Sequence, residues 1–266
     1  MKTAKVLLAA LGSMFVAASA AQANVIAYEG FDMPSTLNIG GTAGSGQGSA
    51  TWNGSTWQSG GGPFWNRSSV GVPYPNLATL PGAARIDTAG GGNNEAFRNF
   101  GSQPATGTYW VSTLFTITAS NTSSSIGYSL FSGGSEKNFV GKPGGAAWEA
   151  TSGGGSSGVT VASQPTVMIL SRYDMASGKQ FHWLSPNISA GQPSDASSWT
   201  GAAGASIFGG GFSFDRIRIG AFSATSGDKI DEIRIGTTFA DVAPLVPEPT
   251  SLAALAAAAV LGRRRR

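Results

Sequence analysis

The chain of 266 residues contains no cysteine and only one histidine, His182. The absence of cysteine excludes a disulfide framework and every zinc site built from thiolates. One histidine is too few for a histidine-based metal site, and no nucleophile motif surrounds it, so we expect His182 to be an ordinary strand residue. A chain without disulfides must depend on a large core, and this one is long enough to build it.

Charged residues are also scarce, at 12% of the chain compared with about 25% in a typical soluble domain. Six of the 17 basic residues and one of the 14 acidic residues lie in the terminal segments described below. The remaining 11 basic and 13 acidic residues give the middle of the chain a net charge of −2 instead of the overall +3. A nucleic-acid surface needs clustered basic residues, so nucleic acid is excluded as an expected partner.

The first 23 residues have the three parts of a secretory signal peptide. Two lysines precede an apolar run over residues 6–18. The small residues Ala21 and Ala23 then form the pattern that signal peptidase accepts, with cleavage expected before Asn24. An uncleaved membrane anchor is the alternative, but its apolar run is too short for a good spanning helix.

Residues 246–266 contain three unlike features in a fixed order. The prolines of Val246, Pro247, Glu248 and Pro249 keep that run extended and accessible to an enzyme. An apolar, alanine-rich helix former then covers residues 252–261. The chain ends in basic residues that stop translocation under the positive-inside rule: Arg263, Arg264, Arg265 and Arg266.

This arrangement resembles the PEP-CTERM sorting signal of Gram-negative bacteria. The resemblance implies recognition by an exosortase, a membrane transpeptidase-like enzyme, with cleavage close to Pro247 and Pro249. The 13 residues from Thr250 to Gly262 span about 20 Å as a helix, less than a bilayer core of about 30 Å. We therefore expect transient anchoring in the inner membrane, followed by delivery to the envelope, the cell surface or the medium. An ordinary tail anchor or a disordered tail is the alternative.

Between the two signals, residues 24–243 show short strand-like runs separated by Gly, Ser, Asn and Pro, which is the pattern of an all-β domain. The glycine-rich residues 40–96 are expected to form long loops and short strands of the same domain, and residues 153–158 a loop. Strands are predicted over residues 25–31, 109–118, 125–131, 166–173, 179–184, 212–222 and 229–237.

One phrase occurs twice near the end of this domain, as Asp215–Gly220 and as Asp231–Gly236. In both, isoleucines alternate with charged residues, which predicts strands with one apolar and one wet face. Asp231 and Glu232 are adjacent, so on a regular strand they point to opposite faces. The expected role of these two carboxylates is structural pairing with Arg216, Arg218 or Arg234.

The opening run Ala27–Asp32 and the closing run Asp231–Val242 together resemble the ends of a laminin G-like, concanavalin A-type jelly roll. The resemblance implies a two-sheet antiparallel β-sandwich whose first and last strands lie close together. It also implies a concave face that binds sugars or is simply structural.

Catalysis is not expected. Glycoside hydrolysis needs two facing carboxylates, and the Glu-x-Asp-x-x-Glu phrase of the related laminarinase-like enzymes is absent, so a divergent glycoside hydrolase is the last alternative. No cofactor or metal is expected either. Calcium is the one alternative, with Asp32, Asp87 and Asp231 as candidate ligands, although no dense acidic loop accompanies them.

Tryptophans in the glycine-rich region are the candidate glycan-binding residues: Trp52, Trp57 and Trp65. Further aromatic and amide groups that could complete a sugar site are Tyr74, Trp148, Asn53, Asn66, Asn93 and Asn94. The alternative is that these aromatic rings pin long loops to the core. The sequence therefore predicts an exported, non-catalytic structural β-sandwich. The alternative is a carbohydrate-binding module for extracellular polysaccharide.

Overall fold

The computed structural model describes residues 25–32, 39, 57–61, 65–86, 93–118, 124–207, 209–224 and 226–245. The predicted signal peptide and sorting signal lie outside these residues. The strands are β1 (Val25–Glu29), β2 (Gln58–Gly61), β3 (Trp65–Ser68), β4 (Ala83–Ile86), β5 (Asn93–Gln103), β6 (Thr108–Thr116), β7 (Ser125–Ser132), β8 (Ser135–Lys142), β9 (Ala147–Ala150), β10 (Gly155–Thr160), β11 (Thr166–Asp174), β12 (Lys179–Leu184), β13 (Ala205–Ser206), β14 (Phe214–Phe222) and β15 (Lys229–Gly236). The short helices are η1 (Ile188–Ala190), η2 (Asp195–Ser197) and α2 (Phe239–Val242).

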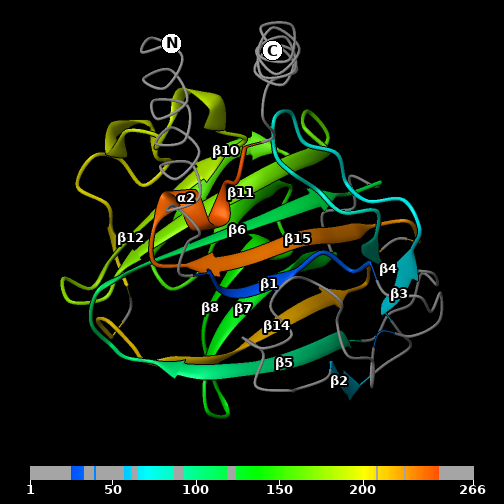
Figure 1. The fold of residues 1–266 in the computed structure, drawn as a ribbon, viewed down its shortest axis with the longest axis horizontal. Coiled ribbons are helices and arrows are strands. Elements are labelled where there is room, and N and C mark those ends of the chain that lie inside the picture. The colour runs from blue at the N-terminus through cyan, green and yellow to red at the C-terminus, as the bar shows by residue number, and fades with distance from the viewer. Residues whose placement is uncertain are drawn as a thin grey trace, which may run out of the picture.

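Two antiparallel sheets pack face to face as a β-sandwich, which confirms the predicted fold class (Figure 1). Sheet A has eight strands in the order β13-β12-β11-β6-β15-β4-β3, with β1 paired to β15 beside this path. Sheet B has seven strands in the order β10-β9-β8-β7-β14-β5-β2. The first and last described strands therefore pair with each other, as the resemblance implied.

The main hydrophobic core lies between the sheets, and alternation along the strands builds it. Ile217 and Ile219 of β14 point inward from sheet B, and Ile233 and Ile235 of β15 point inward from sheet A. Val111 and Phe115 of β6, and Ile117 directly after this strand, join the core, as the sequence predicted. Apolar area buried on one face of each sheet is the main stabilising contribution of such a sandwich.

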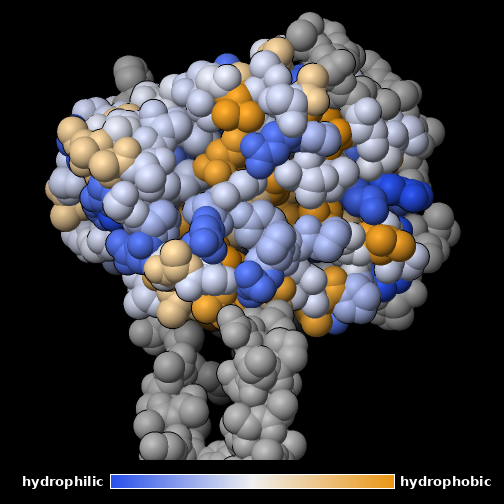
Figure 2. Space-filling model, turned by 90° about the horizontal axis from the view of Figure 1, so that it is seen from above, coloured by the Kyte–Doolittle hydropathy of each residue, from blue (hydrophilic) through white to orange (hydrophobic). Residues whose placement is uncertain are grey.

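A second apolar cluster covers the opposite, outer face of sheet A. Trp110 and Leu114 of β6 and Trp183 of β12 pack there against residues of the segment 70–82 and of α2. Seen from above, the molecule shows apolar residues only as separate patches among polar ones (Figure 2). Sheet A is thus buried on both faces, although antiparallel sheets commonly leave one face wet.

The prediction of a wet face on β15 is therefore wrong. Asp231 is fully buried and the side chain of Arg234 is 5% exposed, because the segment 70–82 lies over them. The prediction that Asp231 and Glu232 point to opposite faces is also wrong. A β-bulge in β15 gives Glu232 a φ of 51°, so that both carboxylates accept from backbone N–H groups of that segment, at Val72 and Leu80. The predicted pairing with arginine is confirmed for Glu232 and Arg234, at 2.6 Å.

After β15 the chain is fixed to sheet A by several polar contacts. Thr238 and Asp241 form a capping box at the start of α2, and the Ser112 hydroxyl donates to the Val242 carbonyl at 2.6 Å. The Ala78 N–H donates to the Pro244 carbonyl at 3.1 Å, and Leu245 forms an antiparallel bridge with Leu77. The last described residue is therefore held on the outer side of sheet A.

Candidate functional site: a groove on sheet B

The outer face of sheet B carries an open groove with a volume of about 370 Å³. This volume lies at the lower end of the range of about 300–1,000 Å³ for small-molecule sites. The groove is lined by Asn93, Glu95, Ser125, Glu136, Phe139, Pro143, Thr151, Arg218, Gly220, Ala221 and Phe222. Strands β5, β14, β7 and β8 supply most of these residues, and they are adjacent in the sheet.

Strand register explains why the sheet is hollow at this place. Gly220 of β14 lies opposite Gly127 of β7, which in turn lies opposite Gly141 of β8. Three adjacent strands therefore present no side chain along one line. The ring of Phe139 uses part of this space, since a Cβ atom added to Gly127 would lie 2.5 Å from a ring carbon of Phe139. The hollow beside Gly220 remains open.

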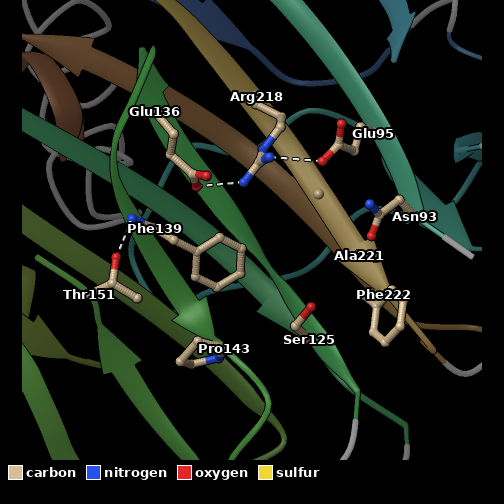
Figure 3. Close-up of a pocket in the computed structure, with 11 residues that line it drawn as sticks. Asn93, Glu95, Ser125, Glu136, Phe139, Pro143, Thr151, Arg218, Ala221 and Phe222 are labelled. Atoms are coloured by element: carbon tan, nitrogen blue, oxygen red, sulfur yellow. Dashed lines mark hydrogen bonds and ion pairs between the residues drawn. The ribbon is translucent and has the colours of Figure 1, made fainter. Parts of the chain in front are cut away.

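A charged cluster forms one bank of the groove (Figure 3). The guanidinium of Arg218 donates from Nη1 to Glu95 at 2.8 Å, and from Nη2 to Glu136 at 2.5 Å and to the Ser129 hydroxyl at 3.0 Å. The same guanidinium lies 5.2 Å from the ring centre of Phe131. These contacts join β5, β14, β7 and β8 and fix the three charged groups in one place.

The other side of the groove is formed by apolar and amide groups. Phe222 is 44% exposed, which makes it one of the most exposed large apolar residues among those described. It pairs with Asn93 in β5 and with Ser125 in β7, so an aromatic ring, an amide and a hydroxyl share one level of the sheet. Figure 3 shows Phe139 and Pro143 across the groove from Asn93 and Phe222.

This combination of groups suits binding more than catalysis. Exposed rings provide apolar faces for the C–H groups of a ligand, and amide, hydroxyl and carboxylate groups provide hydrogen bonds. Among the described lining residues, Glu95 and Glu136 are the only two carboxylates, and both are turned to Arg218. A glycosidase pair must instead face each other across the bond that is cleaved.

A second groove of about 450 Å³ lies beside the segment 70–82, and none of its described lining residues is charged. It contains Tyr74, one of the aromatic residues considered for a sugar site, whose hydroxyl donates to the Pro186 carbonyl at 2.9 Å. The Tyr74 hydroxyl is thus already used inside the fold.

Two of the three candidate tryptophans are buried. Trp57 is 0% exposed, stacks on Phe31, and donates from Nε1 to Glu29 at 3.0 Å. Trp65 is 2% exposed and donates from Nε1 to the Asn94 carbonyl at 3.1 Å. In this structure neither ring offers a face to a ligand, because each fills the core where its N–H finds an internal partner. Trp52 lies outside the described residues.

His182 is fully buried between the sheets in a polar network. Its Nδ1 lies 2.8 Å from the Ser171 hydroxyl and its Nε2 3.0 Å from Gln180 Oε1. Ser171 continues the network to Tyr128 of the opposite sheet, at 2.9 Å. Burial lowers the pKa of His182 to about 3, so the ring is neutral at ordinary pH. These contacts give it a role in joining the sheets.

Of the candidate calcium ligands, Asp231 is held inside the fold. Asp231 Oδ2 accepts from the Val72 N–H at 2.7 Å, and burial raises the pKa of this carboxyl well above its usual range. Asp87 lies outside the described residues. Among the residues that the structure does describe, no group of three or more His, Cys, Asp and Glu could hold a metal ion. The described residues also contain no helix that is long and apolar enough to cross a membrane.

Sequence reasoning found Asn93 but missed most of the groove. Arg218 was expected only as a structural partner, and Glu95, Glu136, Phe139 and Phe222 were not considered. One signal was present: Arg218 and Gly220 occupy alternate outward positions of a well-predicted strand. Their partners come from strands more than 80 residues away, which the chain order does not reveal.

Comparisons with known proteins place the fold. No family model and no curated protein matches the chain. Among solved structures, the globular domain of T. cruzi calreticulin is similar at 12% identity and a TM-score of 0.50, covering 82% of this chain and 90% of that chain. Two further structures are more distant. The Emp46p carbohydrate recognition domain has 10% identity and a TM-score of 0.35, covering 77% of this chain and 96% of that chain. The VIP36 exoplasmic/lumenal domain in its metal-free form has 10% identity and a TM-score of 0.35, covering 81% of this chain and 98% of that chain. The likeness to the calreticulin domain shows a jelly roll of the concanavalin A type.

Proposed function

We propose that this chain is an exported, non-catalytic carbohydrate-binding protein whose ligand lies in the groove on sheet B. The observation that carries the proposal is the groove itself. It combines an exposed ring at Phe222, a second ring at Phe139, and hydrogen-bonding groups at Asn93 and Ser125 over a glycine floor. Shallow grooves with ring faces and fixed polar groups suit the mixed apolar and hydroxyl surface of sugars.

The absence of a catalytic role is part of the proposal. The two carboxylates of the groove are held by one guanidinium, and His182 is buried between the sheets. Incubation with laminarin, agar and alginate fragments should therefore release no product. Release of shorter oligosaccharides that is lost in Glu95→Gln or Glu136→Gln would contradict this part and favour a hydrolase.

The decisive test fills the groove with a side chain. Gly220 does not have a positive φ, and the three atoms nearest to an added Cβ all belong to Arg218, at 3.4 Å or more, so Gly220→Leu should fold normally. Its side chain should occupy the hollow and weaken binding to an immobilised polysaccharide at least about tenfold, the equivalent of about 1.4 kcal/mol. The matched control is Gly134→Leu, because Gly134 lies outside the groove with open space around it.

Two outcomes of this test would contradict the proposal. A glycan array without any signal would leave the β-sandwich with a structural role only. Equal binding by wild type and Gly220→Leu would place the sugar site elsewhere on the molecule. The control variant distinguishes a blocked groove from a general effect of an added apolar side chain.

Export and sorting complete the proposal and depend on the terminal segments alone. The signal peptide ending at Ala23 and the run Val246–Pro249 support secretion, processing by an exosortase, and a place in the envelope or extracellular matrix. The test is fractionation of cells that produce the tagged chain with and without the exosortase. Equal molecular mass and location in both strains would contradict the sorting proposal.

A further inference from the structure

The charges of the groove are not equally accessible. The side chain of Arg218 is 14% exposed, that of Glu95 is 21% exposed, and that of Glu136 is 39% exposed. A ligand that enters the groove therefore meets carboxylate oxygens more readily than the guanidinium.

Three of the five N–H donors of the guanidinium are also already used. Arg218 Nη1 donates to Glu95, and Nη2 is shared by Glu136 and the Ser129 hydroxyl. The Ser129 hydroxyl itself donates to Glu136 at 2.6 Å. The remaining atom, Nε, is buried from solvent. No other cationic residue lines the groove, so its net charge is −1 among the described lining residues.

Resting on the function proposed above, we propose that the groove selects sugars by charge. It accepts uncharged and ammonium-bearing sugars and rejects uronates and other acidic sugars, and Glu136 is the specificity-determining residue. Hydroxyl and ammonium groups can donate to the free lone pairs of Glu136 and Glu95. An acidic group would approach two carboxylates while its natural partner, Arg218, is occupied, and such repulsion is an effective means of discrimination.

The structure offers a closely matched control on the other sheet. Arg172 of β11 also pairs with two carboxylates, Asp174 at 3.2 Å and Asp195 at 2.7 Å. The exposed fractions nearly repeat those of the groove, at 11% for Arg172 and 40% for Asp195. This second cluster lies on the covered side of the molecule and lines neither groove described above. Asp195→Asn thus removes the same charge, at the same exposure, without touching the groove.

The experiment is an array of immobilised polysaccharides in three classes, probed with the whole purified chain. Laminarin and cellulose oligomers are uncharged, chitosan carries ammonium groups, and alginate and polygalacturonate carry uronates. The wild type should bind one or more of the non-acidic glycans at least tenfold more tightly than either acidic one. Binding that is tighter for alginate or polygalacturonate would overturn the charge selection and leave the sugar-binding function standing. A blank array would remove both.

Replacing the carboxylates of the groove with amides should then weaken the preference for non-acidic glycans. Glu136→Gln keeps an oxygen that can accept from Arg218, and the double variant Glu95→Gln/Glu136→Gln leaves the guanidinium without a counter-charge. The preference for non-acidic over acidic glycans should fall at least threefold in the single variant and at least tenfold in the double variant. The newly gained binding to acidic glycans should disappear in high salt, since it depends on partly exposed charges.

Asp195→Asn separates a groove effect from the charge of the whole molecule. It should leave the preference unchanged within experimental error. An equal shift in Asp195→Asn and Glu136→Gln would overturn the assignment to the groove. An unchanged preference in the double variant, with thermal unfolding like that of the wild type, would overturn it as well.

Discussion

The two outer faces of the sandwich contain the same local chemistry in opposite settings. On sheet A, Arg172 lies 4.0 Å from the ring centre of Phe181 and within 6 Å of two tryptophan rings, and segments from elsewhere in the chain pack over this face. On sheet B, Arg218 lies near one ring and borders an open groove. An arginine with two carboxylates is thus part of the covered interior on one face and borders the proposed binding groove on the other. The difference lies in the surroundings of the ion pairs, which are packed segments at Arg172 and an open groove at Arg218.

The strongest way to sharpen this contrast is to remove a ring from the covered face. Trp110 is 3% exposed and packs against Trp183, Phe239 and Arg172. Trp110→Ala should lower the free energy of unfolding by about 3–5 kcal/mol, the usual cost of truncating a buried large aromatic residue. Urea denaturation measures this loss. The folded fraction should bind glycans as the wild type does, and a binding defect beyond the loss of folded protein would show that the two faces are coupled.

Acid offers a second separation, because lowering the pH acts on a histidine that is buried between the sheets. The folded pKa of His182 is about 3, below the unfolded value of about 6.5, so between these pH values the unfolded chain binds a proton that the folded chain does not. The free energy of unfolding should therefore fall by up to about 1.4 kcal/mol for each pH unit from pH 6.5 towards pH 3.

Other buried groups act in the opposite direction. Glu29, Asp231 and Glu232 have raised carboxyl pKa values because of burial, so their contribution to stability decreases as pH rises above the unfolded value. The readout is therefore the difference in pH slope between wild type and His182→Gln over pH 6.5–4.5. An identical slope in both proteins would show that His182 is not the group responsible.

A direct comparison of the two arginines should give a smaller effect. Arg172→Gln loses contact with three rings, whereas Arg218→Gln loses contact with one. Cation–π contacts contribute about 0.5–2 kcal/mol each according to their exposure. The sheet A variant should be the less stable of the two by about 1 kcal/mol in thermal or urea unfolding. Equal stabilities of the two variants would mean that the additional rings around Arg172 do not add to the stability of the fold.

The smallest change in stability is expected at the rim of the groove. Phe222 is 44% exposed, so Phe222→Ala should change the free energy of unfolding by no more than about 0.5 kcal/mol. Its effect on glycan binding should be larger, about three- to tenfold, because a ring face is lost. Isothermal titration beside thermal unfolding measures both quantities. A variant that loses stability and keeps its affinity would reverse the roles assigned to this face.

The sequence predicts the strands in which apolar and polar residues alternate. Trp110 and Leu114 of β6 point to one face and Val111 and Phe115 to the other, as the alternation indicates. Strands β8, β9 and β10 were not predicted, and β10 occupies Gly155–Thr160, where a loop was expected. Lysine, serine and glycine carry little strand preference of their own. Pairing with neighbouring strands keeps these segments extended.

The groove shows what a single chain cannot reveal. Its floor exists because Gly220 and Gly127 come from different strands and share one register position. Its charged bank joins Glu95 and Arg218, which are 123 residues apart. Register between distant strands is a property of the assembled sheets, so no local pattern indicates it. The buried rings of Trp57 and Trp65 illustrate the same limit, because their partners Glu29 and Asn94 lie about 30 residues away.

The contacts that fix Leu245 also determine how the domain bears mechanical load. A pulling force applied beyond Leu245 reaches the bridge to Leu77 and the capping box of α2 before it reaches β15. Strand β15 is an inner strand, with β6 on one side and β4 and β1 on the other, so the force is spread over rows of hydrogen bonds on both sides. The groove lies on the other sheet, outside this path. A pull on the C-terminal side can therefore leave the shape of the proposed binding face unchanged.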